Sequence, residues 1–377
     1  MEHFSLYYYF QDLEKKILEI IMENKKVFVG ASGGVDSSTT MALLKKQGYA
    51  VTGVFIKVWQ PDFVECQWKE DRLDAMRVCA TLGVDFLDLD LEKEYKRDVF
   101  DYMVNEYKNG RTPNPDVMCN KKIKFGAFLD FALKNGADFI ATGHYVRLDG
   151  EKLLVGVDRN KDQSYFLWTL TGEQLKHCLF PVGKYEKTKV RELAKSFKLP
   201  TAQKKDSQGL CFVGKVDMKE FLERFIPQRP GNVQNKQGEV IGKHDGIFYY
   251  TIGQRHGFLI TEKGVDDKPY YVVAKDLEKN ILTVSNERFP DNSPEELTGV
   301  GHLLVKIGGV NWISGEKPSL DKRYQARIRY RQILQDCSLV EEEGGIAVKF
   351  EKFQNVAKGQ SVVIYDGEVC LGGGVVK

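Results

Sequence analysis

The chain has 377 residues, of which 42% are hydrophobic and 29% charged, so it is long enough for two or three domains with cores of their own. The 55 Lys and Arg residues nearly balance 53 Asp and Glu residues, so a surface for nucleic acid would have to be a local patch. No apolar run approaches the ~20 residues of a membrane span. The seven scattered cysteines, with no basic-then-apolar signal at the N-terminus, predict a cytoplasmic protein that does not contact a membrane.

The first 150 residues alternate short apolar runs with amphipathic stretches, which predicts an α/β fold with a doubly wound parallel sheet. The expected strands cover residues 27–31, 51–58, 86–90 and 138–142. The expected helices cover residues 37–47, 70–82, 93–108 and 120–135. A glycine follows each of these helices, at Gly48, Gly83, Gly110 and Gly136, where helices commonly stop.

From residue 151 the pattern changes. A hairpin is followed by predicted helical segments at 162–176, 187–198 and 216–225, and then by short β-rich runs between Gly, Asn and Asp turns. Examples of these runs are residues 270–274, 281–284, 325–330, 347–350 and 361–365. We therefore predict three domains: an α/β domain over residues 1–215, a small β-rich domain over 216–275 and an antiparallel β-barrel over 276–377.

The strongest local signal, GASGGVDSS at residues 30–38, lies between the first strand and the first helix. Glycines let backbone amides turn toward an anion, and the helix start adds free N–H groups and the positive end of its dipole. Ser32, Ser37 and Ser38 add hydroxyl groups, and Asp36 is placed either to cap the helix or to hold a magnesium ion. The loop lacks the lysine of a Walker motif. It is interpreted as a pyrophosphate-binding loop, the alternative being a tight turn with a Ser/Asp cap.

The SGGVDS pattern resembles the fingerprint of the PP-loop ATP pyrophosphatases. The resemblance implies cleavage of ATP between its α and β phosphates, adenylation of a carbonyl oxygen and displacement of AMP by a nucleophile. Gly143 follows the fourth predicted strand, at the carboxyl edge of the sheet where nucleotides bind. It is expected either to let the backbone approach adenine or ribose, or simply to form a turn.

Two of the seven cysteines are candidates for chemistry. Cys119 follows a Pro-rich loop and is expected at the start of a helix beside three lysines, a setting that lowers a thiol pKa and favours a nucleophile. Cys211 lies in a polar loop with basic neighbours. The other five are expected to be buried or incidental, and no C-x-x-C or histidine cluster predicts a metal site.

Seven motifs in order along the chain resemble those of the bacterial tRNA-specific 2-thiouridylases (MnmA). They are GASGGVDSS, RTPNPDVMCNKKIKFGAF, ATGHY, KDQSYFL, KKDSQGLCFVG, YTIGQRHG and RIRYRQ. The resemblance implies 2-thiolation of the wobble uridine of tRNA, with ATP and Mg²⁺ and a persulfide supplied by a cysteine desulfurase or a sulfur-relay protein. It also implies that the β-rich central domain contacts tRNA.

Site residues follow from the same resemblance. ATP would be bound by Gly30, Ala31, Ser32, Gly33, Gly34, Val35, Asp36 and Ser37, with Ile56 and Gly143 at the nucleotide. Ile56 stands where the family usually shows methionine. Cys211 would carry the persulfide and Cys119 would be the second thiol, leaving a Cys119–Cys211 disulfide for a reductant to reopen. Asp116 would shuttle a proton, the alternative being a helix cap.

The resemblance also implies tRNA contacts. Asn114, Pro115 and Asp116 would surround the target base, while Lys161, Asp162, Gln163, Arg329 and Tyr330 would touch tRNA. The candidates for phosphate contact are Lys121, Lys122, Lys124, Lys204, Lys205, Arg327, Arg329 and Arg331. The alternation of Arg327, Arg329 and Arg331 predicts that all three lie on one face of a strand.

Three alternatives remain open at this point. The first is a PP-loop ligase of the argininosuccinate or GMP synthetase kind, which needs no paired thiols. The second is a non-catalytic tRNA-binding protein that keeps a relic nucleotide fold. The third concerns mechanism: some related thiolases use an iron-sulfur cluster, for which Cys119, Cys211 and Asp116 would be a sparse ligand set.

Overall fold

The structure, a computed structural model, describes residues 25–64, 68–205, 218–261, 268–286, 302–354 and 356–377. By their internal contacts these residues form two compact units. The first contains residues 25–95, 120–164 and 172–205, and the second contains 96–119, 165–171 and the residues from 218 onward. The helical segment that ends in Cys119 therefore packs with the C-terminal part of the chain.

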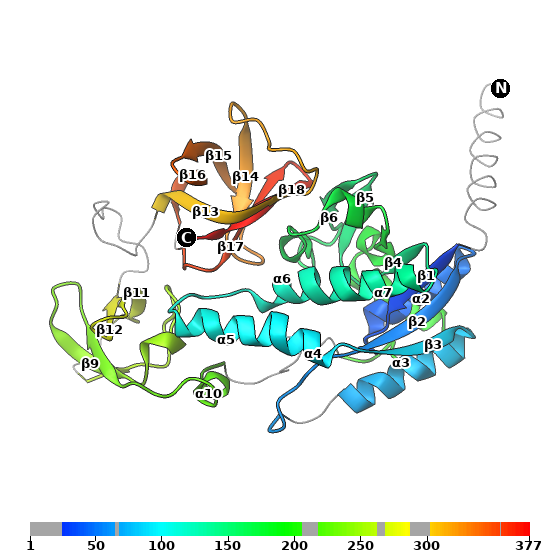
Figure 1. The fold of residues 1–377 in the computed structure, drawn as a ribbon, viewed down its shortest axis with the longest axis horizontal. Helices are drawn as coiled ribbons and strands as arrows, with labels where there is room; N and C mark the ends of the chain where they lie inside the picture. The colour runs from blue at the N-terminus through cyan, green and yellow to red at the C-terminus, as the bar shows by residue number, and fades with distance from the viewer. Residues whose placement is uncertain (1–24, 65–67, 206–217, 262–267, 287–301, 355) are drawn as a thin grey trace. The chain divides into compact units, whose positions relative to one another are not determined.

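The first unit is built on a parallel sheet with the strand order β3-β2-β1-β4-β7. Figure 1 labels β1, β2, β3 and β4 of this sheet. The strands are β1 (Lys26–Gly30), β2 (Ala50–Lys57), β3 (Asp85–Asp90), β4 (Phe139–Ala141) and β7 (Cys178–Leu179). β1 lies inside the sheet and its Val-Phe-Val run is buried, as expected for a strand covered on both faces. The predicted doubly wound α/β fold is confirmed.

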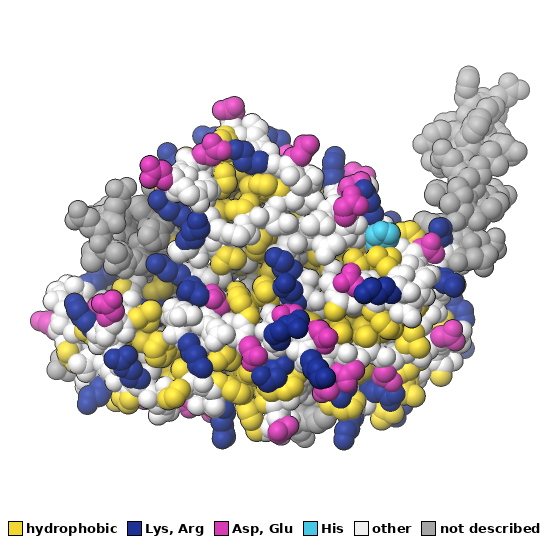
Figure 2. Space-filling view, viewed as in Figure 1, with side chains coloured by type: hydrophobic (Ala, Val, Ile, Leu, Met, Phe, Trp, Pro, Cys, Tyr) yellow, Lys and Arg dark blue, Asp and Glu magenta, His cyan; other side chains and the backbone are white. Residues whose placement is uncertain are grey.

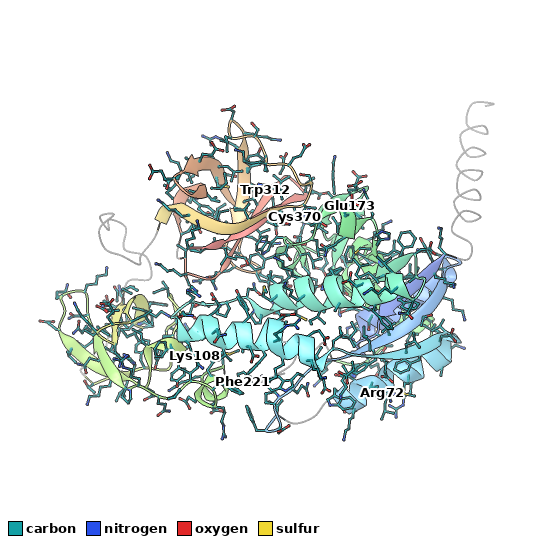
Figure 3. All side chains as sticks on the ribbon, viewed as in Figure 1. Arg72, Lys108, Glu173, Phe221, Trp312 and Cys370 are labelled. Carbon is teal, nitrogen blue, oxygen red and sulfur yellow. The ribbon has the colours of Figure 1, made fainter. Side chains whose placement is uncertain are left out.

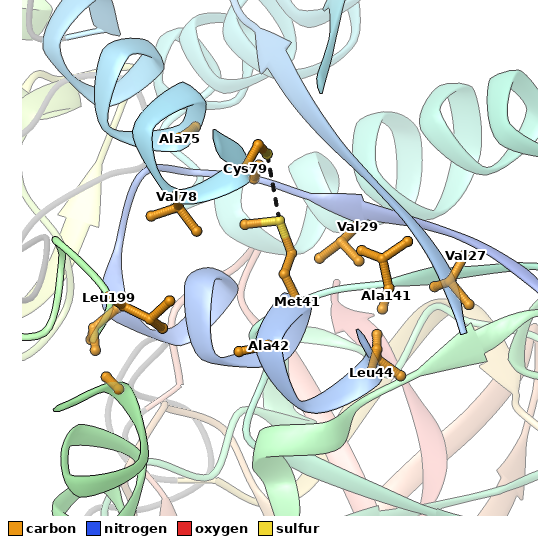
Figure 4. Close-up of a cluster of buried hydrophobic side chains, with 14 of the residues drawn as sticks. Val27, Val29, Met41, Ala42, Leu44, Ala75, Val78, Cys79, Ala141 and Leu199 are labelled. Carbon is orange, nitrogen blue, oxygen red and sulfur yellow. Dashed lines mark hydrogen bonds between the residues drawn. The ribbon is translucent and has the colours of Figure 1, made fainter. Parts of the chain in front are cut away.

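Helices cover both faces of this sheet. On one face, Val27 and Val29 of β1 belong to a core cluster with residues of α2 (Val35–Lys46), α3 (Trp68–Leu82) and α9 (Lys187–Ser196) (Figure 4). Phe28 points the other way, and its ring centroid lies 6.2 Å from that of Phe131 on α7 (Phe128–Lys134). Arg72 on α3, labelled in Figure 3, pairs with Asp88 and ties this helix to β3.

The predicted helix at 93–108 is confirmed as a continuous run of α4 (Glu92–Tyr95), a π-helical stretch (Lys96–Phe100) and α5 (Asp101–Lys108). The helix predicted at 120–135 begins earlier than expected. It runs through α6 (Pro115–Cys119), a second π-helical stretch (Asn120–Ala127) and α7. Asn114 caps it by accepting a 3.2 Å hydrogen bond from the Val117 N–H, and Pro115 takes the first helical position.

The helix predicted at 162–176 is wrong. The structure has a 3₁₀ turn at Ser164–Phe166 and the short α8 (Gly172–Leu175) in its place. Asp162 accepts hydrogen bonds from the backbone N–H groups of Gly156 and Ser164, so its side chain satisfies an irregular loop in place of a helix. The predicted hairpin is present as β5 (Val146–Asp149) and β6 (Lys152–Val155), and a further 3₁₀ turn covers Pro181–Lys184.

The second unit contains a five-stranded sheet with the order β10-β9-β8-β12-β11. Its elements are α10 (Met218–Glu223), β8 (Gly231–Gln234), β9 (Val240–His244), a 3₁₀ turn (Ile247–Tyr249), β10 (Leu259–Ile260), β11 (Tyr271–Asp276) and β12 (Ile281–Ser285). Phe221 of α10, labelled in Figure 3, packs edge to face on Phe100 with the centroids 6.1 Å apart. The strands predicted at 270–274 and 281–284 are confirmed as β11 and β12.

The C-terminal part of this unit is a closed antiparallel barrel with the order β13-β16-β15-β14-β17-β18, closed by pairing of β13 with β18. Its strands are β13 (His302–Trp312), β14 (Arg323–Arg327), β15 (Gln335–Glu342), β16 (Gly345–Gln354), β17 (Ser361–Asp366) and β18 (Val369–Val376). The predicted barrel is confirmed, but the strand predicted at 325–330 ends at Arg327. The chain turns there and reaches φ +62° at Arg331.

Candidate functional site

The phosphate loop leaves β1 at Gly30 and enters α2 at Val35. Gly33 has φ +68°, and a Cβ there would overlap the backbone carbonyl of Asp71 on α3, so the turn requires glycine. The first N–H groups of α2 have no acceptor within the helix. The loop therefore presents backbone donors in a turn that α3 holds in shape.

Three serines line this loop with different roles. The Ser32 and Ser37 hydroxyl oxygens lie 3.1 Å apart, and the Ser37 hydroxyl donates to the Gly34 carbonyl at 3.2 Å. The Ser38 hydroxyl is buried and donates to the same carbonyl at 2.8 Å. Ser32 is exposed, so of the three its hydroxyl is the most accessible to a ligand.

Asp36 was expected either to cap α2 or to hold magnesium. The residue at the helix N-cap is Gly34, with no side-chain cap, so the capping alternative is wrong. The Asp36 carboxylate instead accepts hydrogen bonds from the Tyr145 hydroxyl, at 2.7 Å, and from the Lys187 ammonium, at 2.7 and 2.8 Å. Sequence reasoning missed both partners, because they are 109 and 151 positions away and carry no local signal.

Gly143 follows β4 and meets the phosphate loop directly. A Cβ there would lie 2.9 Å from both the Ser37 nitrogen and the Asp36 Cβ. The glycine thus allows two backbone segments at the carboxyl edge of the sheet to touch. Ile56 is half-buried near the same edge, in register with Leu89 of β3.

His144 follows Gly143 and lies in an aromatic pocket. The residue is 6% exposed, and its ring contacts Phe125 and Phe180 and shares a 2.7 Å hydrogen bond with the Thr142 hydroxyl. Burial, assisted by the positive charge of Lys124, lowers the pKa of His144 well below its ordinary value. The imidazole is therefore neutral at physiological pH.

The segment carrying the predicted base contacts belongs to the second unit and is held at several points. The Thr112 hydroxyl lies 3.1 Å from that of Thr251, and the Thr112 N–H donates to the Lys358 carbonyl at 2.7 Å. The Asn114 side chain caps α6 by accepting a hydrogen bond from the Val117 N–H. Asn114 is thus a structural anchor whatever else it contacts.

Cys119 ends α6 and is 3% exposed, so the expectation that it stands at a helix start is wrong. The helix begins four residues before it, which places the thiol among packed side chains. Asp116 is half-buried in the first turn of α6. Residues 206–217, which include Cys211, lie outside the described residues. The pairing of Cys211 with Cys119 therefore stays a prediction.

The residues expected to touch tRNA divide into two kinds. Asp162 is 3% exposed, and it accepts three hydrogen bonds from Gly156 and Ser164. The Gln163 side chain accepts from the Tyr145 N–H at 3.0 Å. These two residues shape the loop. Lys161, the third member of the motif, is half-exposed.

The three arginines do not share a strand face, because β14 ends at Arg327. Arg327 is buried, donates to the Tyr365 hydroxyl at 2.8 and 3.0 Å, and lies over the rings of Tyr165 and Tyr365. Arg329 donates to the Ile252 carbonyl at 3.2 Å. The exposed member of the trio is Arg331, which stacks on Tyr330 at 5.1 Å.

The lysines expected to contact tRNA phosphates also differ in their pairing and exposure. Lys204 pairs with Asp71 at 2.7 Å and Asp74 at 2.6 Å, so it is neutralised within the fold. Lys121 and Lys122 are exposed. On the face shown in Figure 2 basic and acidic side chains are interspersed, in keeping with the balanced composition.

The remaining described cysteines are buried, as expected. They are Cys79, Cys178, Cys337 and Cys370. Burial raises the pKa of the Cys79 thiol to about 11 and that of Cys337 to about 12, so both are poor nucleophiles at neutral pH. Within the described ranges no group of three or more His, Cys, Asp or Glu side chains is arranged to hold a metal ion.

A parallel sheet that feeds an SGGVDSS loop into a helix, followed by a closed barrel, defines a PP-loop protein of the HUP class. Three family models match: the tRNA methyl transferase HUP domain at residues 25–215, the tRNA methyl transferase PRC-barrel domain at 219–286 and the aminomethyltransferase beta-barrel domain at 303–376.

The match to known proteins extends over nearly the whole chain. The tRNA-specific 2-thiouridylase MnmA of Pseudomonas paraeruginosa is 48% identical over 361 residues, which are 94% of each chain. That of Francisella tularensis subsp. novicida is 47% identical over 368 residues, 94% of this chain and all of the relative. The chain belongs to the tRNA-specific 2-thiouridylase (MnmA) family, as its motifs indicated.

A solved structure, the U34-tRNA thiolase NcsA from Methanococcus maripaludis with its [4Fe-4S] cluster, is 20% identical. It covers 57% of this chain and 74% of its own, with a TM-score of 0.36. At that score the likeness does not bear on the activity of this chain. Among the described residues, no helix has the length and apolar character needed to cross a membrane.

Proposed function

We propose that this chain catalyses the ATP-dependent 2-thiolation of a wobble uridine in tRNA, yielding 2-thiouridine, AMP and pyrophosphate. The observation that carries this conclusion is whole-chain membership of the 2-thiouridylase family together with an intact phosphate loop. The family-model descriptions speak of methyl transfer, whereas the relatives are thiouridylases. We follow the relatives, because a PP-loop activates a carbonyl with ATP and methyl transfer needs no such step.

The reaction requires activation because the 2-carbonyl of uridine is a poor electrophile. Its oxygen attacks the α phosphorus of ATP, and pyrophosphate leaves with the bridging oxygen and its electron pair. The terminal sulfur of a persulfide on Cys211 then attacks carbon 2 and AMP leaves. The Cys119 thiolate attacks the inner sulfur of this adduct, so the S–S bond breaks and the outer sulfur stays on carbon 2. Alternatively, Cys119 attacks the inner sulfur of the persulfide and releases sulfide for the same attack. Once sulfur has been delivered, a Cys119–Cys211 disulfide remains for a reductant to reopen.

The phosphate loop supports the ATP role. Its backbone donors, together with the exposed Ser32 hydroxyl, suit a triphosphate. Ile56 and Gly143 are proposed to border the nucleoside. In such sites Mg²⁺ is usually coordinated by one or two carboxylates and by the substrate phosphates. The Asp36 carboxylate beside the loop fits that set of ligands. Bound there, the ion would supply charge neutralisation for the phosphates.

The second unit supports the roles of the target-base residues. Asn114, Pro115 and Asp116 are proposed to border the extruded base, with Asp116 moving a proton to or from it. Since Cys119 is buried in the described conformation, it is proposed to become exposed when tRNA binds. The base must leave its stack to enter such a pocket, which costs a few kcal/mol.

Partners and organisation complete the proposal. The chain is proposed to have three partners, all in the cytoplasm: tRNA, a persulfide donor of the desulfurase or relay type, and a reductant. Lys161, Arg329 and Tyr330 are proposed to contact the tRNA. We propose a catalytic domain to residue 215, a central tRNA-contacting domain and a barrel. The second boundary, expected near 275, is best drawn after Ser285, because β12 pairs in parallel with β8 of the central sheet.

The test is incubation of the full chain with ATP, a persulfide source and unmodified tRNA, with thiouridine detected by mercury-gel retardation. We expect product with the parent chain and with Cys178→Ala, a buried-thiol control, and none with Cys119→Ser or Cys211→Ser. Unchanged AMP release and product in Cys119→Ser would favour a ligase without paired thiols. Absence of tRNA-dependent AMP release in the parent would favour a binding protein, and stoichiometric iron after anaerobic purification would favour a cluster mechanism.

A further inference from the structure

One tyrosine joins the phosphate loop to the KDQ motif (residues 161–163). The Tyr145 hydroxyl donates to the Asp36 carboxylate at 2.7 Å. The Tyr145 N–H donates to the side-chain oxygen of Gln163 at 3.0 Å, and the Tyr145 carbonyl accepts from the Gln163 N–H at 3.1 Å. The backbone of Tyr145 is therefore bonded to the motif proposed to contact tRNA, while its side chain reaches the loop proposed to hold ATP.

Packing holds Tyr145 in this place. The residue is 2% exposed and belongs to a small apolar cluster with side chains of α2 and α9. A Cβ added to Gly156 would lie 2.5 Å from the Tyr145 carbonyl oxygen, and the Gly156 N–H donates to the Asp162 carboxylate at 3.1 Å. Asp162 and Gln163, two members of the motif, therefore hold the backbone around Tyr145.

A second route leads from the same motif to the same carboxylate. The Asp158 carboxylate accepts from the Lys161 N–H at 3.2 Å and, through its other oxygen, from the Lys187 N–H at 3.0 Å. The Lys187 ammonium contacts both Asp36 oxygens, at 2.7 and 2.8 Å. All these residues belong to the first unit. Two chains of hydrogen bonds thus connect the motif with Asp36.

The two routes differ in stiffness. Lys187 acts on Asp36 through a four-carbon side chain with many torsions. Tyr145 acts through a planar ring with two side-chain torsions, which loses little entropy when it is held. A change in the position of the motif is therefore passed to Asp36 more directly by the Tyr145 hydroxyl than by the Lys187 ammonium.

We propose that Tyr145 is a positioning residue that couples tRNA binding at the KDQ motif to ATP binding at the phosphate loop. Contact of a tRNA phosphate with Lys161 orders the motif, which fixes the backbone of Tyr145 and, through its hydroxyl, the direction of the Asp36 carboxylate. ATP then binds a loop that is already ordered, so less entropy is lost on binding. This inference rests on the proposed use of ATP and tRNA.

Coupling of this kind has a signature that a purely structural role lacks. Binding free energies are linked, so tRNA must tighten ATP by the same factor by which ATP tightens tRNA. If the Tyr145 hydroxyl only shaped the phosphate loop, its removal would change ATP affinity equally with and without tRNA. The ratio of the two affinities, called here the coupling factor, therefore distinguishes the two roles.

The test measures binding of α,β-methylene ATP, which cannot transfer AMP, to the full chain with and without saturating unmodified tRNA. In the parent chain we expect a coupling factor of about tenfold, and the same factor for tRNA with and without the analogue. Tyr145→Phe keeps the packed ring and removes the hydroxyl. Its coupling factor should fall below about twofold, while the affinity for each ligand alone changes by no more than about twofold, the scatter of independent sites.

The matched control is Tyr185→Phe, which removes a hydroxyl from another ring packed against the same apolar cluster and should keep the coupling. Gln163→Met removes the oxygen that accepts the Tyr145 N–H and should lower the coupling factor as Tyr145→Phe does. The double variant should lose no more coupling than either single variant, because residues that act on one route are not additive.

Three results would overturn the inference. They are an unchanged coupling factor in Tyr145→Phe, an equal loss of analogue affinity with and without tRNA in that variant, and additive losses of coupling in the double variant. Tyr145-dependent coupling in a chain that makes no thiouridine would refute the thiolation and leave this inference standing. Thiouridine formation by a parent chain without such coupling would refute the inference alone.

Discussion

Gly143 and Ser37 are in backbone contact: a Cβ added to Gly143 would come within 2.9 Å of the Ser37 nitrogen. One of these residues begins the loop after β4, and the other lies in the first turn of α2, 106 positions earlier in the chain. Because real Cβ atoms essentially never approach backbone so closely, an added methyl group must displace the start of α2. The geometry of the phosphate loop therefore depends on a glycine outside its own motif.

The first prediction follows from that contact. Gly143→Ala should weaken ATP binding by about tenfold or more. The reason is that moving the start of α2 on the order of 1 Å misplaces the groups that are positioned to hold the phosphates. The control is Gly136→Ala, where φ is +76° but no atom lies within 4 Å of the added Cβ. It should lower stability by about 1 kcal/mol and leave ATP affinity intact. Equal ATP affinity in the two variants would show that the contact is not restrictive.

The second prediction separates two arginines that the sequence groups together. Arg327→Ala removes two hydrogen bonds to Tyr365 and a buried guanidinium, and should lower the free energy of unfolding by about 3 kcal/mol. Arg331→Ala, at an exposed position, should leave stability nearly unchanged while weakening tRNA binding and reducing its salt dependence by about one phosphate contact. Urea unfolding and filter binding at several salt concentrations measure these effects, and the reverse pattern would refute the assignment.

The third prediction concerns the KDQ motif. Asp162→Ala leaves the N–H groups of Gly156 and Ser164 without their acceptor, so stability should fall by about 2 to 4 kcal/mol. Lys161→Ala, at a half-exposed position, should cost less stability than Asp162→Ala and lower tRNA affinity a few-fold. Differential scanning fluorimetry beside tRNA binding distinguishes the two roles. A stable Asp162→Ala chain with lost tRNA binding would instead support a direct contact by Asp162.

The fourth prediction is a pH dependence of stability. Burial lowers the pKa of His144, so below about pH 6.5 the unfolded chain binds a proton at this residue that the folded chain does not. The stabilisation is full above pH 6.5 and declines as the pH falls, by up to about 1.4 kcal/mol per pH unit. His144→Phe should flatten this slope between pH 6.5 and 5 in urea unfolding. His256→Gln, at an exposed histidine, should keep the slope, and an unchanged slope in His144→Phe would refute the assignment.

Local patterns predicted the elements whose physics is local. The alternation of apolar strands with amphipathic helices predicted the doubly wound sheet, and the short β runs predicted the barrel. The N-terminal limit of α6 was also readable, since Asn114 followed by Pro115 is an N-cap and first-turn pair. The residues of α6 were interpreted from the sequence as a Pro-rich loop, which placed Cys119 at the start of a helix. In the structure Cys119 lies inside the helix.

By itself the sequence determined the family, the chemistry of the phosphate loop and the fold class, because these depend on short motifs and on periodicity. Only the tertiary structure decided which charges are used for what. Asp162 and Arg327 look like surface contacts in the sequence and are buried anchors in the fold, whereas Lys187 looks like an ordinary helix residue and reaches Asp36. Burial and pairing across more than a hundred positions are set by packing, and no local pattern encodes them.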